Sequence, residues 1–162
     1  MHSTKILVLL AASAASVLAV AVPPSDQNLQ ARAATVTCKP KINLSTEKFV
    51  VNVDHAKAEA KKAGFTDGKS GYPHRFQNHD GIKWGVHNCD DKKNPLQEYP
   101  VYWQGYKKQT VWNKEVKVKE QESTPLRVVY ANKKGSIIYC GAMTHSKVEK
   151  NNRGLDYFQK CD

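Results

Sequence analysis

The N-terminal part of the chain is strongly apolar, whereas the remainder alternates between short apolar runs and polar segments. Lys5 precedes an unbroken apolar run from Ile6 to Ala12, which Ser and Ala residues extend to Val22. This stretch is too short and too rich in Ala and Ser for a transmembrane helix, and it contains the small-x-small pattern Ala19-Val20-Ala21. The pattern predicts a secretory signal peptide over residues 1–21.

A second segment separates this peptide from the patterned part of the chain. Residues 22–37 contain Pro23-Pro24, Ser, Gln and Ala, with few side chains to bury. We expect a flexible tail or a short propeptide there, followed by one domain over residues 38–162, since a chain of 162 residues suits a single domain.

One helix is predicted early in this domain. Asn52 can cap a helix over Val53–Lys62, and Gly64 can end it. Val53, Ala56 and Ala60 then fall on one face of the helix at helical spacing. We therefore expect this helix to pack on a sheet.

After Phe65 the pattern changes to short strand-like runs: Gly81–Val86, Glu98–Trp103, Leu126–Ala131, Ile137–Thr144 and Asp156–Lys160. Asn132-Lys133-Lys134-Gly135 is typical of a hairpin loop between two of them. In the long connection 104–124, Val116 and Val118 alternate with lysines, which suggests an extra hairpin. The expected fold class is α+β, with one helix packed on a four- to five-stranded antiparallel sheet.

Charge narrows the range of partners without selecting one. The chain has 25 Lys and Arg against 15 Asp and Glu, a net charge of +10, which loss of the signal peptide with its single Lys reduces to +9. Such a charge favours polyanions, whether RNA, DNA, anionic lipid or acidic polysaccharide. A merely soluble, Lys-rich surface accounts for the composition equally well.

The four cysteines, Cys38, Cys89, Cys140 and Cys161, all follow the signal peptide. An even number in an exported chain indicates two disulfides, for which three pairings exist. A bond between Cys38 and Cys161 would tie the two ends of the domain together and leave Cys89 to pair with Cys140. Zinc is the competing interpretation, because His74 and His79 have finger-like spacing, but no closely spaced Cys pair accompanies them.

Four polar clusters fall within or beside predicted strands: Tyr72–Phe76, Gln97–Val101, Leu126–Tyr130 and Met143–Ser146. Each alone is more typical of a solvated strand face than of a functional site. Together they supply a carboxylate, an arginine and two histidines, which can converge on a phosphodiester.

The ordered set resembles the fungal guanyl-specific ribonucleases, members of the small microbial ribonuclease superfamily that includes barnase. The resemblance runs from about Cys38 to Cys161. Its motifs are Tyr72-Pro73-His74, Asn78-His79-Asp80-Gly81, Glu98-Tyr99-Pro100-Val101, Arg127-Val128-Val129-Tyr130, Thr144-His145 and Phe158-Gln159-Lys160-Cys161. The Cys38–Cys161 bond also fits this family.

The resemblance implies a secreted endoribonuclease that cleaves single-stranded RNA by transesterification to a 2′,3′-cyclic phosphate. It requires no cofactor or metal, and we expect a monomer that does not associate with membranes. The implied catalytic residues are Glu98 as base, His145 as acid, His74 supporting the base, Arg127 holding the phosphate, Tyr72 donating to it, and Phe158 packing beneath it.

The resemblance also places a guanine pocket at five consecutive residues: Phe76, Gln77, Asn78, His79 and Asp80. Asp80 stands where the family usually has Glu, His79 where a Tyr stacks on the base, and Gln77 in place of Asn. We expect a guanine preference that these changes loosen. Judged without the resemblance, Asn78–Gly81 is an ordinary polar turn.

Two segments, 104–124 and 145–158, are longer than the family usually has and rich in Lys. They suggest an alternative function, a catalytically weak or inactive ribonuclease-like effector that binds RNA or a host protein. The complete set Glu98, His74, Arg127 and His145 favours the enzyme, because a binding protein needs no acid–base pair. A membrane-active protein is disfavoured, since the predicted helix has little bulky apolar surface.

Overall fold

The computed structural model describes residues 34–162. The predicted signal peptide and residues 22–33 of the predicted tail lie outside the described residues. No helix within residues 34–162 is long and apolar enough to cross a membrane. The first strand begins at Thr35, so Thr35–Thr37 belong to the folded domain and not to the flexible segment expected up to residue 37.

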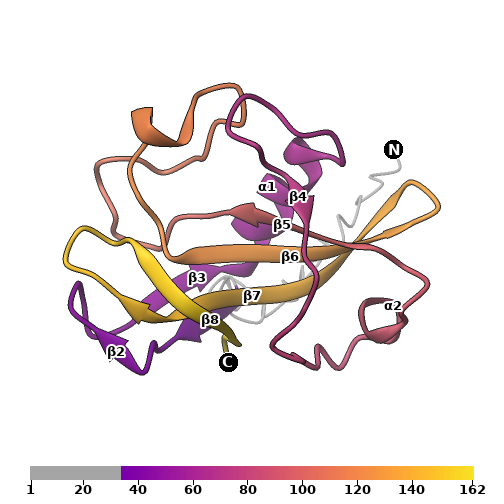
Figure 1. The fold of residues 1–162 in the computed structure, drawn as a ribbon, viewed down its shortest axis with the longest axis horizontal. Coiled ribbons are helices and arrows are strands. Elements are labelled where there is room, and N and C mark those ends of the chain that lie inside the picture. The colour runs from indigo at the N-terminus through magenta and orange to yellow at the C-terminus, as the bar shows by residue number, and fades with distance from the viewer. Residues whose placement is uncertain (1–33) are drawn as a thin grey trace, which may run out of the picture. The chain divides into compact units, whose positions relative to one another are not determined.

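The main sheet has six strands (Figure 1). Its path runs through β2 (Ile42–Asn43), β7 (Ser136–Val148), β6 (Leu126–Lys133), β5 (Leu96–Pro100) and β4 (His74–Arg75), and β8 (Gly154–Lys160) pairs with β7. All the pairs are antiparallel except β2 with β7. A separate two-stranded sheet joins β1 (Thr35–Cys38) to β3 (Phe49–Asn52).

One face of the main sheet packs on helix α1 (Val53–Ala63). Asn52 Oδ1 accepts a hydrogen bond from the His55 N–H at 2.9 Å and so caps the helix, which ends at Gly64 with a positive φ of 68°. The buried core on this side comprises Ala56 and Ala60 of the helix with Tyr99, Val128, Tyr130 and Ala142 of the sheet. The predicted helix and its packing are confirmed.

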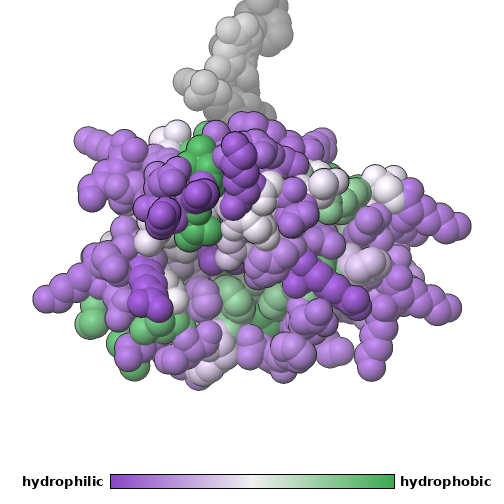
Figure 2. Space-filling view, turned by 45° about the horizontal axis from the view of Figure 1, so that its top comes forward, coloured by the Kyte–Doolittle hydropathy of each residue, from purple (hydrophilic) through white to green (hydrophobic). Residues whose placement is uncertain are grey.

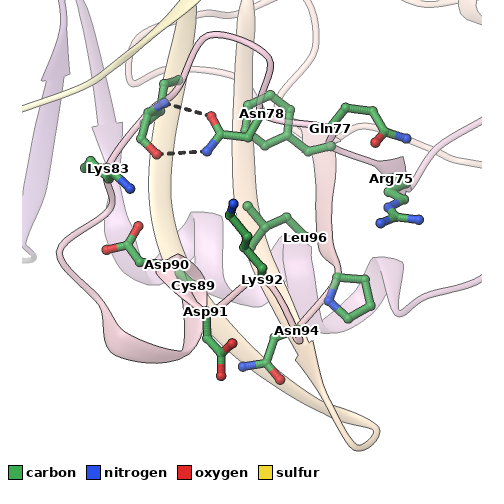
Figure 3. A pocket seen from close by; sticks show the side chains of 13 residues that line it. Arg75, Gln77, Asn78, Lys83, Cys89, Asp90, Asp91, Lys92, Asn94 and Leu96 are labelled. Carbon is green, nitrogen blue, oxygen red and sulfur yellow. Dashed lines mark hydrogen bonds between the residues drawn. The ribbon is translucent and has the colours of Figure 1, made fainter.

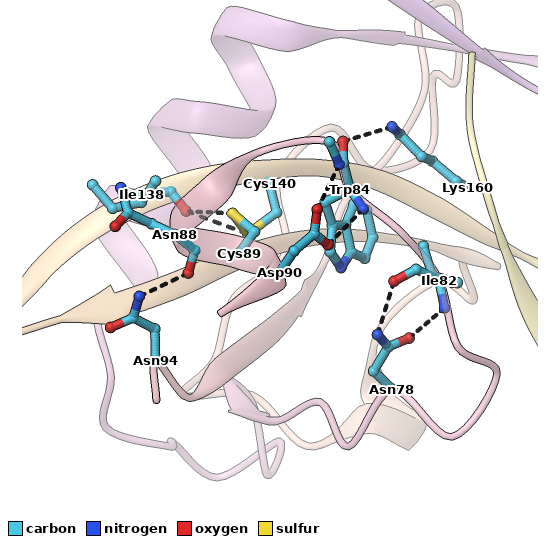
Figure 4. The surroundings of a disulfide bond; sticks show 11 residues. Asn78, Ile82, Trp84, Asn88, Cys89, Asp90, Asn94, Ile138, Cys140 and Lys160 are labelled. Carbon is cyan, nitrogen blue, oxygen red and sulfur yellow. Dashed lines mark hydrogen bonds between the residues drawn. A yellow bond between two sulfur atoms is a disulfide. The ribbon is translucent and has the colours of Figure 1, made fainter. Parts of the chain in front are cut away.

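The other face of the sheet is covered in part by the segment between β4 and β5, which contains helix α2 (His87–Asp90). Trp84 of this segment packs with Leu96 of β5 and with Val129 and Met143 of the sheet. Asp90 accepts hydrogen bonds from the N–H groups of Trp84 and Gly85, each at 2.9 Å (Figure 4). These bonds, the Trp84 one first, lower the pKa of the Asp90 carboxyl.

Both predicted disulfides are present, Cys38–Cys161 and Cys89–Cys140, and Figure 4 shows the second of them. The first joins β1 to the C-terminal end of the domain. The second ties α2 to β7 and holds the β4–β5 segment on the sheet. Since every cysteine of the chain is in a disulfide, none is a thiolate ligand for zinc.

Three strand predictions are confirmed as β6, β7 and β8, and the predicted turn at Lys134-Gly135 joins β6 to β7. The strand predicted at Glu98–Trp103 lies earlier, at Leu96–Pro100. Two predictions are wrong. Gly81–Val86 is not a strand, because Asn78 and Asp90 hold its backbone through side-chain hydrogen bonds. Residues 116–119 form no hairpin, and only a single 3-10 turn, η1 (Val118–Glu120), occurs there.

The surface is mainly hydrophilic, and in Figure 2 hydrophobic residues reach it only in small separate groups. Within residues 34–162, the large apolar side chains that are exposed are Ile42, Leu44, Val118 and Tyr157. Val118 lies on η1 in the long 104–124 connection, next to the face of the sheet that carries the predicted catalytic residues.

Candidate active site

Five adjacent strands each place one predicted catalytic side chain on the face of the sheet opposite α1. In the order β4, β5, β6, β7 and β8 these residues are His74, Glu98, Arg127, His145 and Phe158. His74 lies opposite Glu98 in the β4–β5 ladder, Glu98 opposite Val129 in the β5–β6 ladder, and His145 opposite Phe158 in the β7–β8 ladder. Residues directly opposite share a face, and so do residues two apart on one strand, such as Arg127 and Val129.

His74 and Glu98 form a close pair at one side of this row. Nε2 of His74 lies 3.2 Å from Oε1 of Glu98, with the His74 side chain 45% exposed and the Glu98 side chain 7% exposed. Nδ1 of His74 lies 3.3 Å from the Arg75 carbonyl oxygen, which can only accept, so this nitrogen donates. The arrangement leaves Nε2 of His74 facing the Glu98 carboxylate.

Burial raises the pKa of the Glu98 carboxyl, and the charges of Arg127 and then His74 oppose this increase. Its second oxygen, Oε2, is buried and has no hydrogen-bond partner among residues 34–162. A buried acceptor without a partner is costly, and it can be satisfied by a ligand hydroxyl. The group therefore has the two properties of a general base: a raised pKa and a free acceptor.

Arg127 is fixed in the middle of the row. Its Nη1 donates to the carbonyls of Thr124 (3.0 Å) and Leu126 (2.8 Å), and Nη2 donates to the Tyr72 hydroxyl oxygen at 3.0 Å. The guanidinium carbon lies 5.1 Å from the centre of the Tyr72 ring. These contacts hold a positive charge at one place on the sheet.

His145 stands on β7, beside Arg127. Its Nδ1 lies 3.1 Å from the Asp156 carbonyl oxygen, so Nδ1 carries a proton and Nε2 is the nitrogen that titrates. Burial lowers the pKa of the His145 imidazole, and the nearby Arg127 charge lowers it further. The ring lies 4.0 Å from the Phe158 ring, which supports it from β8.

Tyr72 precedes β4 and links His74, at one end of the row, to Arg127 in its middle. Its ring stacks on His74, with centroids 4.6 Å apart, while its hydroxyl meets Arg127. The peptide bond between Tyr72 and Pro73 is cis. All six predicted catalytic residues therefore lie in one connected cluster.

The five residues predicted to bind the base are arranged less uniformly. Phe76 is buried against Trp84 and lies edge-on to Phe158. Asn78, at a φ of 51°, turns its side chain inward, donating to the Ile82 carbonyl and accepting from the Ile82 N–H (Figure 3). Its amide therefore holds the shape of the loop.

Gln77, His79 and Asp80 remain exposed. Asp80 Oδ2 accepts from the Phe158 N–H at 2.9 Å, which places this carboxylate beside the catalytic row. Gln77 faces a separate pocket of about 310 Å³, where Figure 3 shows Arg75 and Gln77 at one edge and Asp91 and Asn94 at the other. This pocket includes none of His74, Glu98, Arg127 or His145.

A sequence model of the ribonuclease family matches residues 34–162 of this chain. The chain belongs to the ribonuclease family. It is therefore an RNA-cleaving enzyme, and the resemblance stated from the sequence motifs is confirmed.

Known proteins agree with this assignment. The chain is 33% identical to ribonuclease mitogillin of Aspergillus fumigatus over 180 residues, covering 91% of this chain and 94% of mitogillin. The solution structure of hirsutellin A from Hirsutella thompsonii is similar at a TM-score of 0.69 and 53% identity, covering 79% of this chain and 98% of that one. The crystal structure of the Aspergillus ribotoxin restrictocin is similar at a TM-score of 0.61 and 25% sequence identity. The match covers 79% of this chain and 99% of restrictocin.

Several groups of this ribonuclease that surround the catalytic row were not predicted. The carbonyls of Thr124 and Asp156 position Arg127 and His145, and a backbone carbonyl leaves no mark in a sequence. Trp112 lies edge-on to Tyr72 and donates through its indole N–H to Ser70 Oγ at 3.3 Å. Gly154 packs so closely on His145 that a Cβ there would lie 2.1 Å from the imidazole Cδ2.

Proposed function

We propose that this ribonuclease is a secreted endonuclease that cleaves single-stranded RNA, with a preference for guanine, by transesterification to a 2′,3′-cyclic phosphate. The observation that carries the proposal is the order of groups across five adjacent strands: His74 with Glu98, then Arg127, then His145 over Phe158. A base, a fixed cation and an acid in that order are what in-line attack on a phosphodiester requires.

Glu98 is the proposed base. Because burial raises its pKa, the Glu98 carboxylate is a stronger proton acceptor than an exposed glutamate. Its Oε2 has no hydrogen-bond partner among residues 34–162 and can accept a hydrogen bond from the ribose 2′-OH. His74 bonds the other oxygen and can carry the proton away through its exposed ring. The 2′-oxygen then attacks phosphorus, which restricts the reaction to RNA, because DNA lacks this atom.

Arg127 and Tyr72 stabilise the charge that grows on the phosphoryl oxygens. Three of the five N–H groups of Arg127 already donate within the protein, while Nε–H has no partner among residues 34–162, so Arg127 acts mainly as a preorganised positive charge. His145 completes the step by protonating the departing 5′-oxygen from Nε2, since Nδ1 is engaged with Asp156.

The guanine preference rests on Asp80. Guanine presents two adjacent donors, N1–H and the exocyclic amine, which a carboxylate can accept with its two oxygens. In this ribonuclease Oδ2 already accepts from the Phe158 N–H, so one oxygen is shared between the protein and the base. The preference is therefore weaker than a free carboxylate would provide.

Export is supported by the two disulfides together with the apolar N-terminal stretch. Disulfides of this kind persist in oxidising compartments and are rare in the cytosol.

Removing the acid–base pair tests the catalytic assignment. Glu98→Gln and His145→Gln are each expected to lower kcat/KM on a single-stranded RNA by about 10²–10⁴, the usual contribution of general acid–base catalysis. The double variant should show no cleavage above background. Glu47→Gln and His87→Gln change exposed residues outside the site and serve as matched controls. Wild-type rates in the folded double variant would refute the assignment.

A further inference from the structure

The Tyr72 side chain connects His74 with Arg127, and its own position depends on residues outside the catalytic row. Its hydroxyl oxygen accepts a hydrogen bond from Arg127 Nη2 at 3.0 Å, while its ring stacks on His74. A tyrosine hydroxyl has one proton to donate. Because the oxygen accepts from Arg127, this proton is free for a phosphoryl oxygen, and its direction depends on where the Tyr72 ring is held.

Trp112, in the 104–124 connection, contacts the Tyr72 ring from outside the row. The two rings meet edge-on, with centroids 5.9 Å apart and an angle of 82° between their planes, an arrangement that aromatic pairs favour. Trp112 is only 3% exposed, whereas the His74 side chain is 45% exposed. Of these two neighbours of Tyr72, Trp112 is therefore the one that is fixed in the core.

A single side chain, Ser70, joins Trp112 to the backbone of Tyr72. The Ser70 Oγ accepts from the Trp112 indole N–H and from the Tyr72 N–H, each at 3.3 Å. Ser70 is buried, so a shift of either donor would leave a buried polar group without its partner. The shared oxygen therefore couples the position of Trp112 to that of Tyr72.

The segment that carries Trp112 is itself anchored to the sheet and to the end of α1. The Trp112 carbonyl accepts from the hydroxyl of Tyr99, on β5, at 3.0 Å. Lys114 Nζ donates to the carbonyls of Ala63 and Thr66 at 3.0 and 2.9 Å. This part of the long connection is thus a firm support for the site.

We propose that Trp112 is a positioning residue for RNA cleavage, which holds the Tyr72 hydroxyl between Arg127 and the phosphate. The proposal rests on the proposed function, in which Tyr72 stabilises the phosphoryl oxygens. Trp112 acts through Tyr72, by the edge contact of its ring and the hydrogen bond to Ser70, and not by touching the reacting atoms. The 104–124 connection then contributes to catalysis as well as to the charge of the protein.

Separate measurement of kcat and KM tests this role. Trp112→Leu is expected to lower kcat about tenfold and to change KM less than about twofold, because the affected contact strengthens in the transition state. A shift of about 1 Å in a catalytic group costs about 10²-fold, and a partial shift costs less. Trp112→Phe keeps an aromatic edge and is expected to recover part of kcat.

Trp103→Leu is the matched control for Trp112→Leu. Trp103 packs on Phe49 and Tyr106, neither of which belongs to the catalytic row, so this variant is expected to keep the wild-type kcat. An unchanged kcat in folded Trp112→Leu would overturn the proposal. Equal losses of kcat in the two Leu variants would overturn it as well, because they would reflect a general loss of packing.

A double-mutant cycle distinguishes action through Tyr72 from direct contact with RNA, since Trp112 also lines a pocket beside Arg127. In a Tyr72→Ala background, Trp112→Leu is expected to change kcat/KM less than about twofold, because no ring remains to be positioned. Losses that multiply in the double variant would show that Trp112 acts independently of Tyr72 and would contradict the proposal. The same cycle with Trp112→Phe gives the answer if the Leu variant does not fold.

A structural measurement separates this proposal from the proposed function. Nuclear Overhauser effects between the ring protons of Tyr72 and His74 report their stacking without any catalysis. They are expected in the wild type and in Trp103→Leu, and are expected to weaken in Trp112→Leu. Weakening in a protein that cleaves no RNA would refute the proposed function and leave the positioning role standing. Unchanged effects in Trp112→Leu of a protein that does cleave RNA would refute the positioning role alone.

Discussion

Burial shifts the pKa values of Glu98 and His145 in opposite directions. Burial raises the pKa of Glu98 from an ordinary value of 4.5 and lowers the pKa of His145 from 6.5, because each loses the hydration of its charged form. The proposed mechanism needs Glu98 ionised and His145 protonated. The interval of pH in which both hold is therefore narrowed from both sides.

This argument predicts a narrow bell for kcat/KM against pH, with its maximum between 4.5 and 6.5. Activity should fall below the raised pKa of Glu98 as the base is protonated, and above the lowered pKa of His145 as the acid is lost. Steady-state rates on one RNA across pH 3–9 measure both limbs. A flat maximum extending above pH 7 would contradict the assigned roles.

At the residue scale, the sequence predicted which side chains lie together on the sheet, but not the groups that hold them in place. His74, Glu98, Arg127 and His145 stand out because each is a charged or titratable residue in an apolar strand-like run, and strand alternation places them on one face. Asp80 was predicted to accept from a base, and the structure adds its bond to the Phe158 N–H. Whether a backbone N–H lies close enough to bond Asp80 depends on how β8 packs, and no local sequence pattern predicts that packing.

At the scale of elements, the β7–β8 hairpin positions the proposed acid. A register shift between His145 and Lys147 breaks the regular ladder, and Gly154 and Asp156 then contact the imidazole from β8. The hairpin leaves room for the ring only because residue 154 has no side chain.

Gly154→Ala is therefore expected to displace the His145 ring and lower kcat about 10–100-fold, since misplacing a catalytic group by about 1 Å has a cost of this order. The alkaline limb of the pH profile should move with it, because the bond to Asp156 changes. Circular dichroism should remain that of the wild type, and Lys150→Ala in the same turn is the control. An unchanged kcat and pH profile would show that the close contact has no catalytic importance.

Regular elements were predicted well where apolar periodicity and caps were clear, as for α1, β6 and β7. The hairpin predicted in the 104–124 connection is absent. Val116 and Val118 do alternate with lysines, but no strand within residues 34–162 pairs with this segment. Gln121 instead bonds the Asn113 and Val116 carbonyls and holds the segment as an irregular loop. These side-chain hydrogen bonds determine the shape of the loop, and they leave no periodic pattern in the sequence from which the shape could be predicted.

At the scale of the whole molecule, the two disulfides restrain both ends of the site. Cys38–Cys161 spans 123 residues of sequence and joins β1 to the residue after β8, the strand that holds Phe158 and Gly154. Cys89–Cys140 spans 51 residues and fixes the segment that contains Asp80.

Replacing Cys38 and Cys161 together by Ser is expected to lower the free energy of unfolding by about 4–5 kcal/mol, from the loop-closure entropy of a bond across this span. The corresponding change at Cys89 and Cys140 should have a similar effect on stability, about 4 kcal/mol for its shorter span, and should also reduce the guanine preference. Urea denaturation of each variant provides the stability comparison. A change below about 1 kcal/mol for the first pair would contradict a role in holding the ends of the domain.

The measurement that tests the central claim most directly is the chemistry and position of the cuts. The purified protein is incubated with an unstructured RNA of defined sequence, and the fragments are identified by mass spectrometry. Transesterification led by Glu98 and His145 predicts cuts mainly after G, each leaving a 2′,3′-cyclic phosphate and a 5′-hydroxyl. Fragments with 3′-hydroxyl and 5′-phosphate ends would contradict it.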